Sequence, residues 1–249
     1  MHPSRRLVLK VGAAVGLGLV AGRAALLSAA DSLPLNKRPI PSTREMVPVV
    51  GLGTNNFDVG DAADIATRKE VLQGMPQLGG SVVDTAPLYG RSEAVIGGIV
   101  ADLGSRDKLF LATKVISRDP DELMRRYPLD FIQVDYSIDN REVAGSVLPL
   151  AQERNIGVLI NTPLGGRRGV GSVLGRVASR PLPDWAAEID AHSWAQVCLK
   201  YVVSHPAVTC ALSGTTQLKH LDDNMRGARG RLPDAAMRTR MEKYWDSNT

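Results

Sequence analysis

Three residues in the first half of the sequence have side chains that could together deliver a proton. Asp84 and Lys114 each stand at the end of a short apolar run, and Tyr89 follows Asp84 by five residues. A phenol can give its proton to a carbonyl oxygen while hydride reaches the carbonyl carbon, but its ordinary pKa of about 10 hinders exchange at neutral pH. A neighbouring ammonium favours the phenolate, and a carboxylate keeps that ammonium charged. The trio therefore predicts a proton-donor site; a buried Asp–Lys ion pair beside an unrelated tyrosine is the alternative.

These three side chains can meet only if the strands that carry them end at the same edge of a sheet. The rest of the sequence predicts parallel βα units, which have this arrangement. A small hairpin between Asn36 and Asn55 runs into the first of six expected strands, which cover residues 47–53, 81–84, 109–113, 131–134, 157–160 and 208–212. Recurring apolar residues predict helices over residues 62–75, 92–103, 121–127, 141–154, 193–204, 218–225 and 234–245. Ser92 is expected to cap the helix that it opens. Alternating buried strands and helices indicate one α/β domain, with its chemistry at the carboxyl ends of the strands.

The basic character of the chain is confined to its start. Residues 1–30 contain four basic and no acidic residues, and the whole chain carries a formal net charge of +4, so residues 31–249 balance to zero. A neutral domain lacks the electrostatic footprint of a nucleic-acid-binding protein. The charge therefore gives no reason to expect a nucleic-acid partner.

The same residues have the pattern of an export signal. Arg5 and Arg6 precede a short apolar run that ends in small residues, which is typical of a secretory signal peptide. The paired arginines resemble a twin-arginine (Tat) signal. We expect a signal peptide over residues 1–30, a domain over residues 31–249, and a periplasmic or otherwise exported protein. The alternatives are a chance arginine pair in an ordinary signal, and an uncleaved leader that tethers the protein to a membrane.

Five short motifs, in this order along the chain, resemble those of the aldo-keto reductases. They are residues 49–54 (VVGLGT), 84–93 (DTAPLYGRSE), 111–115 (LATKV), 213–216 (SGTT) and 220–224 (HLDDN). The resemblance is greatest to the exported, Tat-dependent members. It implies a (β/α) TIM-barrel-like fold behind an N-terminal hairpin, and NADP(H)-dependent reduction of a small aldehyde or ketone. It also implies catalytic roles for Asp84, Tyr89 and Lys114.

The resemblance further implies which residues contact the cofactor. Gln133 matches a glutamine that binds the nicotinamide amide, and Tyr136 lies near it as a stacking ring. The 162–165 loop matches one that covers the pyrophosphate, and the 214–224 stretch matches a binding site for the 2′-phosphate and adenine, where a helix N-terminus suits a phosphate. The full implied set is Gly53, Thr54, Gln133, Thr162, Pro163, Leu164, Gly165, Gly214, Thr215, Thr216, His220, Asp223 and Asn224.

One part of the family pattern is absent. Between Ser117 and Phe131 the family would have two further strands, the first of which carries a catalytic histidine. His192, His205 and His220 do not stand where they could replace it. We therefore expect an incomplete barrel of about six of the eight βα units. Its two open edges would stay unpaired, or pair with each other or with another chain. A catalytically impaired or non-catalytic relative, which binds cofactor or a partner, is the alternative function.

The remaining features predict no second site. Cys198 and Cys210 lie in apolar runs and are expected to be buried free thiols, although an oxidising compartment would permit a disulfide. The Gly- and Arg-rich stretch 165–183 is interpreted as a lid or an insert, with phosphate binding as the alternative. No spacing of His, Asp and Glu predicts a metal site.

Overall fold

The computed structural model describes residues 33–114, 129–166 and 171–248, and from Leu35 onward they belong to one compact unit. The expected signal peptide at 1–30 and the expected helix at 121–127 lie outside the described residues. Within the described ranges no helix has both the length and the apolar character needed to cross a bilayer.

A small antiparallel hairpin precedes the main sheet, as the sequence predicted. It consists of β1 (Lys37–Pro39) and β2 (Met46–Pro48), with Arg38 opposite Val47. Ile40 and Val47 are buried in an apolar cluster with side chains from the main sheet. The hairpin therefore packs against the sheet.

The main sheet has six parallel strands in the order β5-β4-β3-β8-β7-β6. Their bounds are β3 Val50–Gly53, β4 Val82–Asp84, β5 Phe110–Ala112, β6 Phe131–Asp135, β7 Gly157–Asn161 and β8 Cys210–Gly214. The first and last of these strands along the chain, β3 and β8, are paired at the centre of the sheet. The sheet is thus a curled half-barrel whose ends are β5 and β6.

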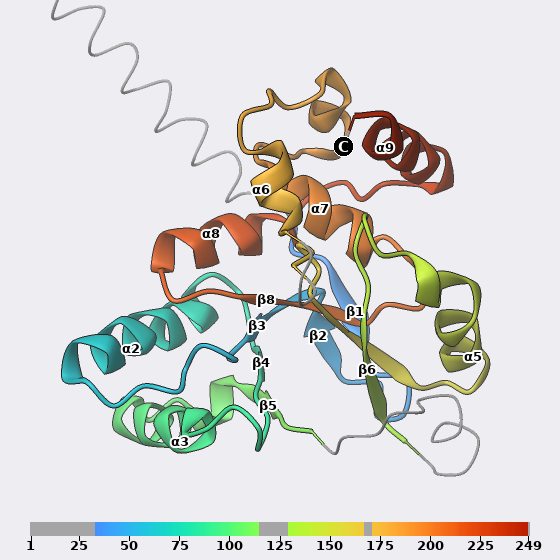
Figure 1. The fold of residues 1–249 in the computed structure, drawn as a ribbon. Coiled ribbons are helices and arrows are strands. Elements are labelled where there is room, and N and C mark those ends of the chain that lie inside the picture. Colours follow the sequence, from blue (N-terminus) through green and yellow to red (C-terminus); the bar gives the residue numbers. More distant parts are fainter. Residues whose placement is uncertain (1–32, 115–128, 167–170, 249) are drawn as a thin grey trace, which may run out of the picture. The chain divides into compact units, whose positions relative to one another are not determined.

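Helices surround the outside of this sheet (Figure 1). Alternate strand residues such as Val83 and Val134 pack against them in the large core, while Val82 and Leu159 belong to the smaller cluster beneath the hairpin. The α-helices are α2 Ala62–Gln77, α3 Ser92–Leu103, α5 Val147–Glu153, α6 Val173–Val177, α7 Trp194–Val203, α8 Leu218–Arg226 and α9 Ala235–Asn248. Short 3₁₀ helices cover η1 Arg106–Lys108, η2 Glu142–Gly145 and η3 Asp184–Ile189.

Two local predictions were wrong. The single helix expected over 141–154 is divided into η2 and α5, because Ser146 leaves helical geometry at φ −133°. Ser92 begins α3, but its side chain makes no capping hydrogen bond; its hydroxyl donates to the carbonyl oxygen of Thr54 at 3.0 Å. The backbone of Ser146 thus interrupts the predicted helix, whereas at Ser92 the helix forms as predicted and only the capping role was wrong.

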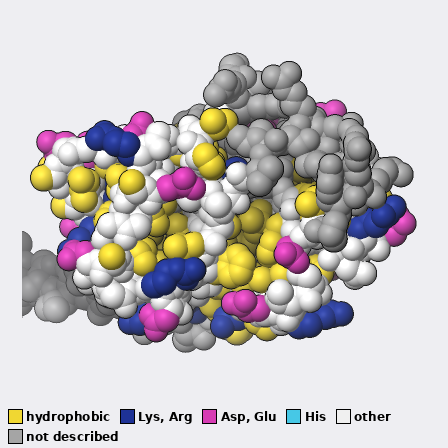
Figure 2. Space-filling model, turned by 90° about the horizontal axis from the view of Figure 1, so that it is seen from below, with side chains coloured by type: hydrophobic (Ala, Val, Ile, Leu, Met, Phe, Trp, Pro, Cys, Tyr) yellow, Lys and Arg dark blue, Asp and Glu magenta, His cyan; other side chains and the backbone are white. Residues whose placement is uncertain are grey.

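The edge strands β5 and β6 approach each other at their first residues. The rings of Phe110 and Phe131 meet edge to face, with 6.0 Å between their centroids. In the sheet order β5 and β6 are the two ends, with β4, β3, β8 and β7 between them, so the curl of the sheet brings its two edges together at these rings. On the face seen from below, apolar side chains gather at the centre with charged ones around them (Figure 2).

Candidate active site

Asp84 and Lys114 form an ion pair where β4 and β5 end. Asp84 is the last residue of β4 and pairs with Ala112, the last residue of β5. Lys114 follows Ala112 by two residues, so both side chains stand at the carboxyl ends of these strands. The Lys114 ammonium donates to Asp84 Oδ2 at 2.5 Å and to the Thr85 carbonyl oxygen at 2.9 Å. The carboxylate is buried and the lysine side chain is only 15% exposed, so water screens the pair weakly.

Tyr89 lies over the same ammonium. The distance from Lys114 Nζ to the centroid of the Tyr89 ring is 4.7 Å. A tight turn places the ring, because the Tyr89 amide donates to the Ala86 carbonyl and Gly90 takes a left-handed backbone with φ +57°. Tyr89 is half-buried while Leu88 beside it is 76% exposed. The three residues singled out by their strand-end spacing therefore lie together, with the tyrosine half-buried and the carboxylate buried.

Burial dominates the electrostatics of Asp84. It raises the pKa of the Asp84 carboxyl above its ordinary value, and the hydrogen bond and positive charge of Lys114 oppose that rise. The Gln133 side chain also lowers the pKa of Asp84. The charge on this carboxylate therefore depends on its two polar neighbours.

A hydroxyl network supports the ends of β3 and β4 beneath this pair. Thr54 is fully buried, and its hydroxyl donates to the Asp84 carbonyl oxygen at 2.8 Å. Ser92 donates to the Thr54 carbonyl, and its hydroxyl lies 3.1 Å from that of Thr85. Thr54, expected at the cofactor, thus bonds within the protein. Sequence reasoning missed Ser92 and Thr85 as supports, although both stand inside the 84–93 motif.

The β8–α8 junction offers backbone donors. Gly53 and Gly214 are register partners at the ends of β3 and β8, and Gly214 is exposed. Thr215 accepts a hydrogen bond from the amide of Gln217, and no side chain caps the first turn of α8. His220 is exposed in that turn. Free N–H groups at a helix N-terminus are suited to an anion, so this end of the site can accept a phosphate.

Two further predicted cofactor residues of α8 face the protein. The Asp223 carboxylate accepts from the Ser193 hydroxyl at 2.8 Å and from the Gln196 amide at 2.7 Å, both at the start of α7. Asn224 is 5% exposed. Thr215 is buried, and Thr216 beside it is half-buried. Asp223 therefore joins two helices, a use that the spacing of the motif did not indicate.

The 162–165 loop forms a tight turn after β7. Thr162 has φ +46° and its carbonyl oxygen accepts from the Gly165 amide at 2.8 Å. Gly165 has φ +69°, and a Cβ atom there would lie 2.5 Å from Val173 of α6. Pro163 is buried and Leu164 packs against the core. Residues 167–170 of the Gly- and Arg-rich stretch lie outside the described residues.

Tyr136 corrects one expectation about the nicotinamide site. It is fully buried, its hydroxyl accepts from Arg238 Nη2 at 2.6 Å, and its ring lies 5.9 Å from that of Tyr201. The expected stacking role is therefore wrong, because the residue after the last position of β6 points into the outer core. Gln133 lies on β6 itself, and its Nε2 is buried without a hydrogen-bond partner in the described part of the chain.

The described histidines stand on other elements. The His192 amide donates to the Gln196 side chain before α7, and the His205 ring packs edge to face on Tyr136 at 5.8 Å. Cys198 and Cys210 are buried free thiols, as predicted, and burial raises the pKa of Cys198 to about 12. Within the described ranges no cluster of His, Cys, Asp and Glu could hold a metal ion.

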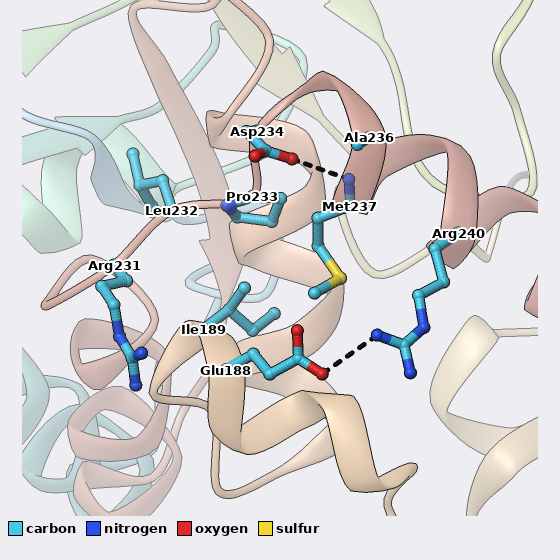
Figure 3. A pocket seen from close by; sticks show the side chains of 9 residues that line it. All are labelled: Glu188, Ile189, Arg231, Leu232, Pro233, Asp234, Ala236, Met237 and Arg240. Carbon is cyan, nitrogen blue, oxygen red and sulfur yellow. Dashed lines mark hydrogen bonds and ion pairs between the residues drawn. The ribbon is translucent and has the colours of Figure 1, made fainter.

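A surface pocket of about 450 Å³ lies between η3 and the start of α9 (Figure 3). An ion pair of 3.0 Å between Glu188 and Arg240 joins its walls, and Asp234 accepts from the Met237 amide at its rim. None of its lining residues belongs to the Asp84 trio or to the predicted cofactor set. It is therefore separate from the candidate site.

A family model and several solved structures resemble this chain. The sequence model of the Aldo/keto reductase family matches residues 49–127 and 121–244. An aldo-keto reductase from Bacillus halodurans in its holo form is similar at TM-score 0.66 and 17% identity, over 84% of this chain and 96% of that chain. One from Klebsiella pneumoniae in complex with NADPH is similar at TM-score 0.63 and 19% identity, over 85% and 96%. A glycerol dehydrogenase from Gluconobacter oxydans is similar at TM-score 0.63 and 15% identity, over 89% and 97%. No curated protein sequence matches the chain.

Proposed function

This chain belongs to the aldo/keto reductase family of oxidoreductases, and on that premise we propose that it reduces a small aldehyde or ketone with NADP(H). The observation that carries the proposal is the Asp84–Lys114–Tyr89 arrangement, in which a 2.5 Å ion pair lies under a half-buried phenol. A structural ion pair alone would need no phenol above it. The solved relative from Klebsiella pneumoniae, described with NADPH, supports the choice of cofactor.

The chain's own residues supply the proton side of the reaction. When bound, NADPH supplies the hydride that adds to the carbonyl carbon. The Tyr89 hydroxyl donates its proton to the carbonyl oxygen. Lys114 favours the phenolate that remains, and Asp84 keeps Lys114 charged and aimed.

The residues present fit a dinucleotide phosphate at one end of the site. The first turn of α8 has no side-chain cap, and Lys219 and His220 are exposed in it. The backbone N–H groups of this first turn and the Lys219 ammonium would hold the 2′-phosphate of the cofactor. Gly214 would allow close approach of the cofactor, since it is exposed beside Gly53 at the strand ends. Roles for Asp223 and Thr54 are weaker, because their polar groups already bond within the protein.

A second function has an observation in its favour. In the described sheet β5 is an edge strand, and the histidine-bearing strand that the family pattern would place beside it is not among the described strands. Within the described ranges, Tyr89 therefore acts without the family's catalytic histidine. A general acid or base contributes about 10²–10⁴-fold in rate, and a protein without one could bind NADPH and turn over little. A catalytically impaired, cofactor-binding relative is thus the competing proposal.

The deciding experiment is NADPH oxidation, followed by absorbance, with a panel of aldehydes and ketones. We expect turnover by the wild type and a loss of about 10²–10⁴-fold in Tyr89→Phe. Tyr244→Phe is the matched control, because that ring packs on Trp185 and Trp194 on the outer side of the fold. Equal rates in wild type and Tyr89→Phe would remove Tyr89 from the mechanism. NADPH binding without turnover would instead favour the impaired relative.

Export and self-association are further proposals. The charge and apolar pattern of residues 1–30 supports Tat-dependent export with cleavage after Ala30. Mass spectrometry of the protein recovered from the periplasm would test this, since an uncleaved mass contradicts cleavage.

The positions of β5 and β6 at the ends of the sheet support pairing with a second copy. A monomeric mass in light scattering at high concentration would contradict it.

A further inference from the structure

The turn between β4 and α3 determines where the Tyr89 ring points. The Tyr89 amide donates to the Ala86 carbonyl oxygen at 3.0 Å, and the Tyr89 carbonyl oxygen accepts from the Ser92 amide at 3.0 Å. Gly90 and Arg91, which stand between Tyr89 and Ser92, are exposed. The direction of the phenol therefore also depends on what contacts these two residues.

Asp58, in the loop between β3 and α2, contacts both of them. Its Oδ1 accepts from the Arg91 amide at 3.0 Å and from Arg91 Nε at 3.3 Å. A Cβ atom at Gly90 would lie 2.3 Å from Asp58 Oδ2, so the carboxylate occupies the space that a side chain would need there. Gly90 also has a left-handed backbone, with φ +57°. One carboxylate thus packs against the backbone of the two residues that follow Tyr89.

The loop that supplies Asp58 is anchored on both sides of this residue. On one side Phe57 is fully buried, and its amide donates to the Thr54 carbonyl oxygen at 3.0 Å. On the other side the Asp61 carboxylate caps α2 by accepting from the Ala63 amide at 2.8 Å. Asp58 lies between these two anchors, so it gives the Tyr89 turn a fixed contact outside the turn itself.

The hydrogen bond from the Arg91 amide is the part of this contact that can set a position. The Asp58 side chain is 52% exposed and that of Arg91 is 65% exposed, and such ion pairs contribute little because water screens them. The amide, by contrast, belongs to the backbone of the turn, and its hydrogen bond is strengthened by a charged acceptor. Asp58→Asn keeps an acceptor oxygen and removes the charge, so the two contributions can be separated.

We propose that Asp58 is a positioning residue for Tyr89, on which it acts through the backbone of Gly90 and Arg91. The proposal rests on the proposed reductase function, in which Tyr89 is the proton donor. No proton passes through Asp58. Its carboxylate holds the turn so that the phenol ring stays over the Lys114 ammonium, 4.7 Å from Nζ to the ring centroid.

The first test requires no turnover and uses the full-length, cofactor-free protein with ¹³C-labelled tyrosine. Tyr89→Phe identifies the NMR signal of the Tyr89 ring by its loss. Asp58→Ala should shift this signal, because the ring is no longer held over the ammonium. Asp58→Asn should leave it near its wild-type position, since the acceptor for the Arg91 amide remains. Asp64→Ala is the control: this aspartate is 55% exposed, pairs with Arg68 on α2, and should not affect the signal.

The second test is kinetic. A misplacement of about 1 Å can cost about 10²-fold in rate, so kcat should fall by about tenfold in Asp58→Ala and by less than about threefold in Asp58→Asn. The NADPH dissociation constant, from tryptophan quenching, should stay within about twofold. Gly90→Ala should also lower kcat, and by a smaller factor in the Asp58→Ala background, because the close contact with Asp58 Oδ2 is then gone.

Three outcomes would contradict these expectations. A Tyr89 signal that does not move in Asp58→Ala, or a kcat that stays within twofold of the wild type, overturns the role of Asp58. Equal losses in Asp58→Ala and Asp58→Asn overturn it too, because the effect then belongs to the surface charge. Absence of NADPH oxidation by the wild type contradicts the reductase function instead, and the Tyr89 ring signal still decides whether Asp58 positions the phenol.

Discussion

The half of the sheet formed by β3, β4 and β5 and the half formed by β6, β7 and β8 use their polar residues differently. In the first half, Asp84, Lys114 and Tyr89 converge at one point on the strand ends. In the second half, Asp223 bonds to the start of α7 and Tyr136 to Arg238 in the outer core. Both halves carry motifs of the same family, yet the predicted residues of the first half contact one another, whereas Asp223 and Tyr136 of the second bond to other parts of the protein.

This difference shows where motif spacing is informative. Residues at the carboxyl ends of parallel strands share one edge of a sheet whatever the helices outside do. A residue on a helix meets whatever packs on that face, and the partner depends on contacts distant in the sequence. The two halves can be compared by disturbing each at its own polar groups and at the strand that joins them.

The largest effect is expected from Lys114→Met, which leaves a buried carboxylate without its cation. Side-chain exposure is 15% for Lys114 and 3% for Asp84, so we expect a loss of about 3 kcal/mol in the free energy of unfolding. Urea denaturation measures it. Adding Asp84→Asn to this variant should recover part of the loss, because no buried charge then remains.

The control is Lys69→Met, which breaks an exposed pair with Asp102 and should cost less than about 1 kcal/mol. Equal losses in Lys69→Met and Lys114→Met would mean that the first half does not depend on its buried pair. The contrast between the halves would then disappear.

The next effect is expected where the halves meet, at the pairing of β3 with β8. A Cβ atom on Gly51 of β3 would stand 2.9 Å from Val82 Cβ in the first half and 3.1 Å from Cys210 Sγ in the second. Gly51→Ala should therefore destabilise the protein by about 1–3 kcal/mol through overpacking, as measured by thermal unfolding. Gly97→Ala is the matched control: no atom lies within 4 Å of a Cβ there, and it stands inside α3. It should stabilise by about 0.5–1 kcal/mol; destabilisation by both changes would contradict the packing argument.

A smaller effect is expected from Asp223→Ala in the second half. The carboxylate accepts two hydrogen bonds from Ser193 and Gln196, so its loss should cost about 1–2 kcal/mol in urea denaturation. NADPH affinity should stay within about twofold, since the carboxylate is engaged with α7. Asp222→Ala, which removes a pair with Arg226 on the same helix, is the control and should cost about 0.5 kcal/mol or less. A large loss of affinity with unchanged stability would make Asp223 a cofactor residue after all.

Part of the fold and part of the candidate site could be predicted from the sequence. The order of helices and strands, the hairpin and the six strands followed from apolar periodicity, because burial of one face sets that pattern. The Asp84 trio followed because strand ends meet. The partners of Ser92, Asp223 and Tyr136 could not be predicted, since each contact joins residues thirty or more positions apart in the sequence. Gln133 was indicated only by the family resemblance, which implied a contact with the nicotinamide amide.

The smallest effect is expected from the pH dependence of His205, beneath the second half. Burial, followed by the charges of Arg238 and Arg38, lowers the pKa of His205 from 6.5 to about 4. Between those values the unfolded chain binds a proton that the folded protein does not, so stability is complete above the ordinary pKa and falls as the pH drops toward about 4. The loss is modest because the ring is only half-buried and solvent screens its charge.

His205→Asn should reduce this pH dependence, because asparagine keeps an acceptor for the Ala207 amide, which bonds His205 Nδ1 at 3.3 Å, and does not titrate. The measurement is the urea midpoint of wild type and variant at pH 7 and at pH 4.5, with His220→Asn as the exposed control on α8. The carboxyl groups are common to all three proteins, so their contributions cancel in the comparison. If the wild type and His205→Asn lose equal stability between pH 7 and pH 4.5, the His205 ring is as solvated as that of His220. His205 would then give the second half no counterpart to the buried Asp84 pair of the first.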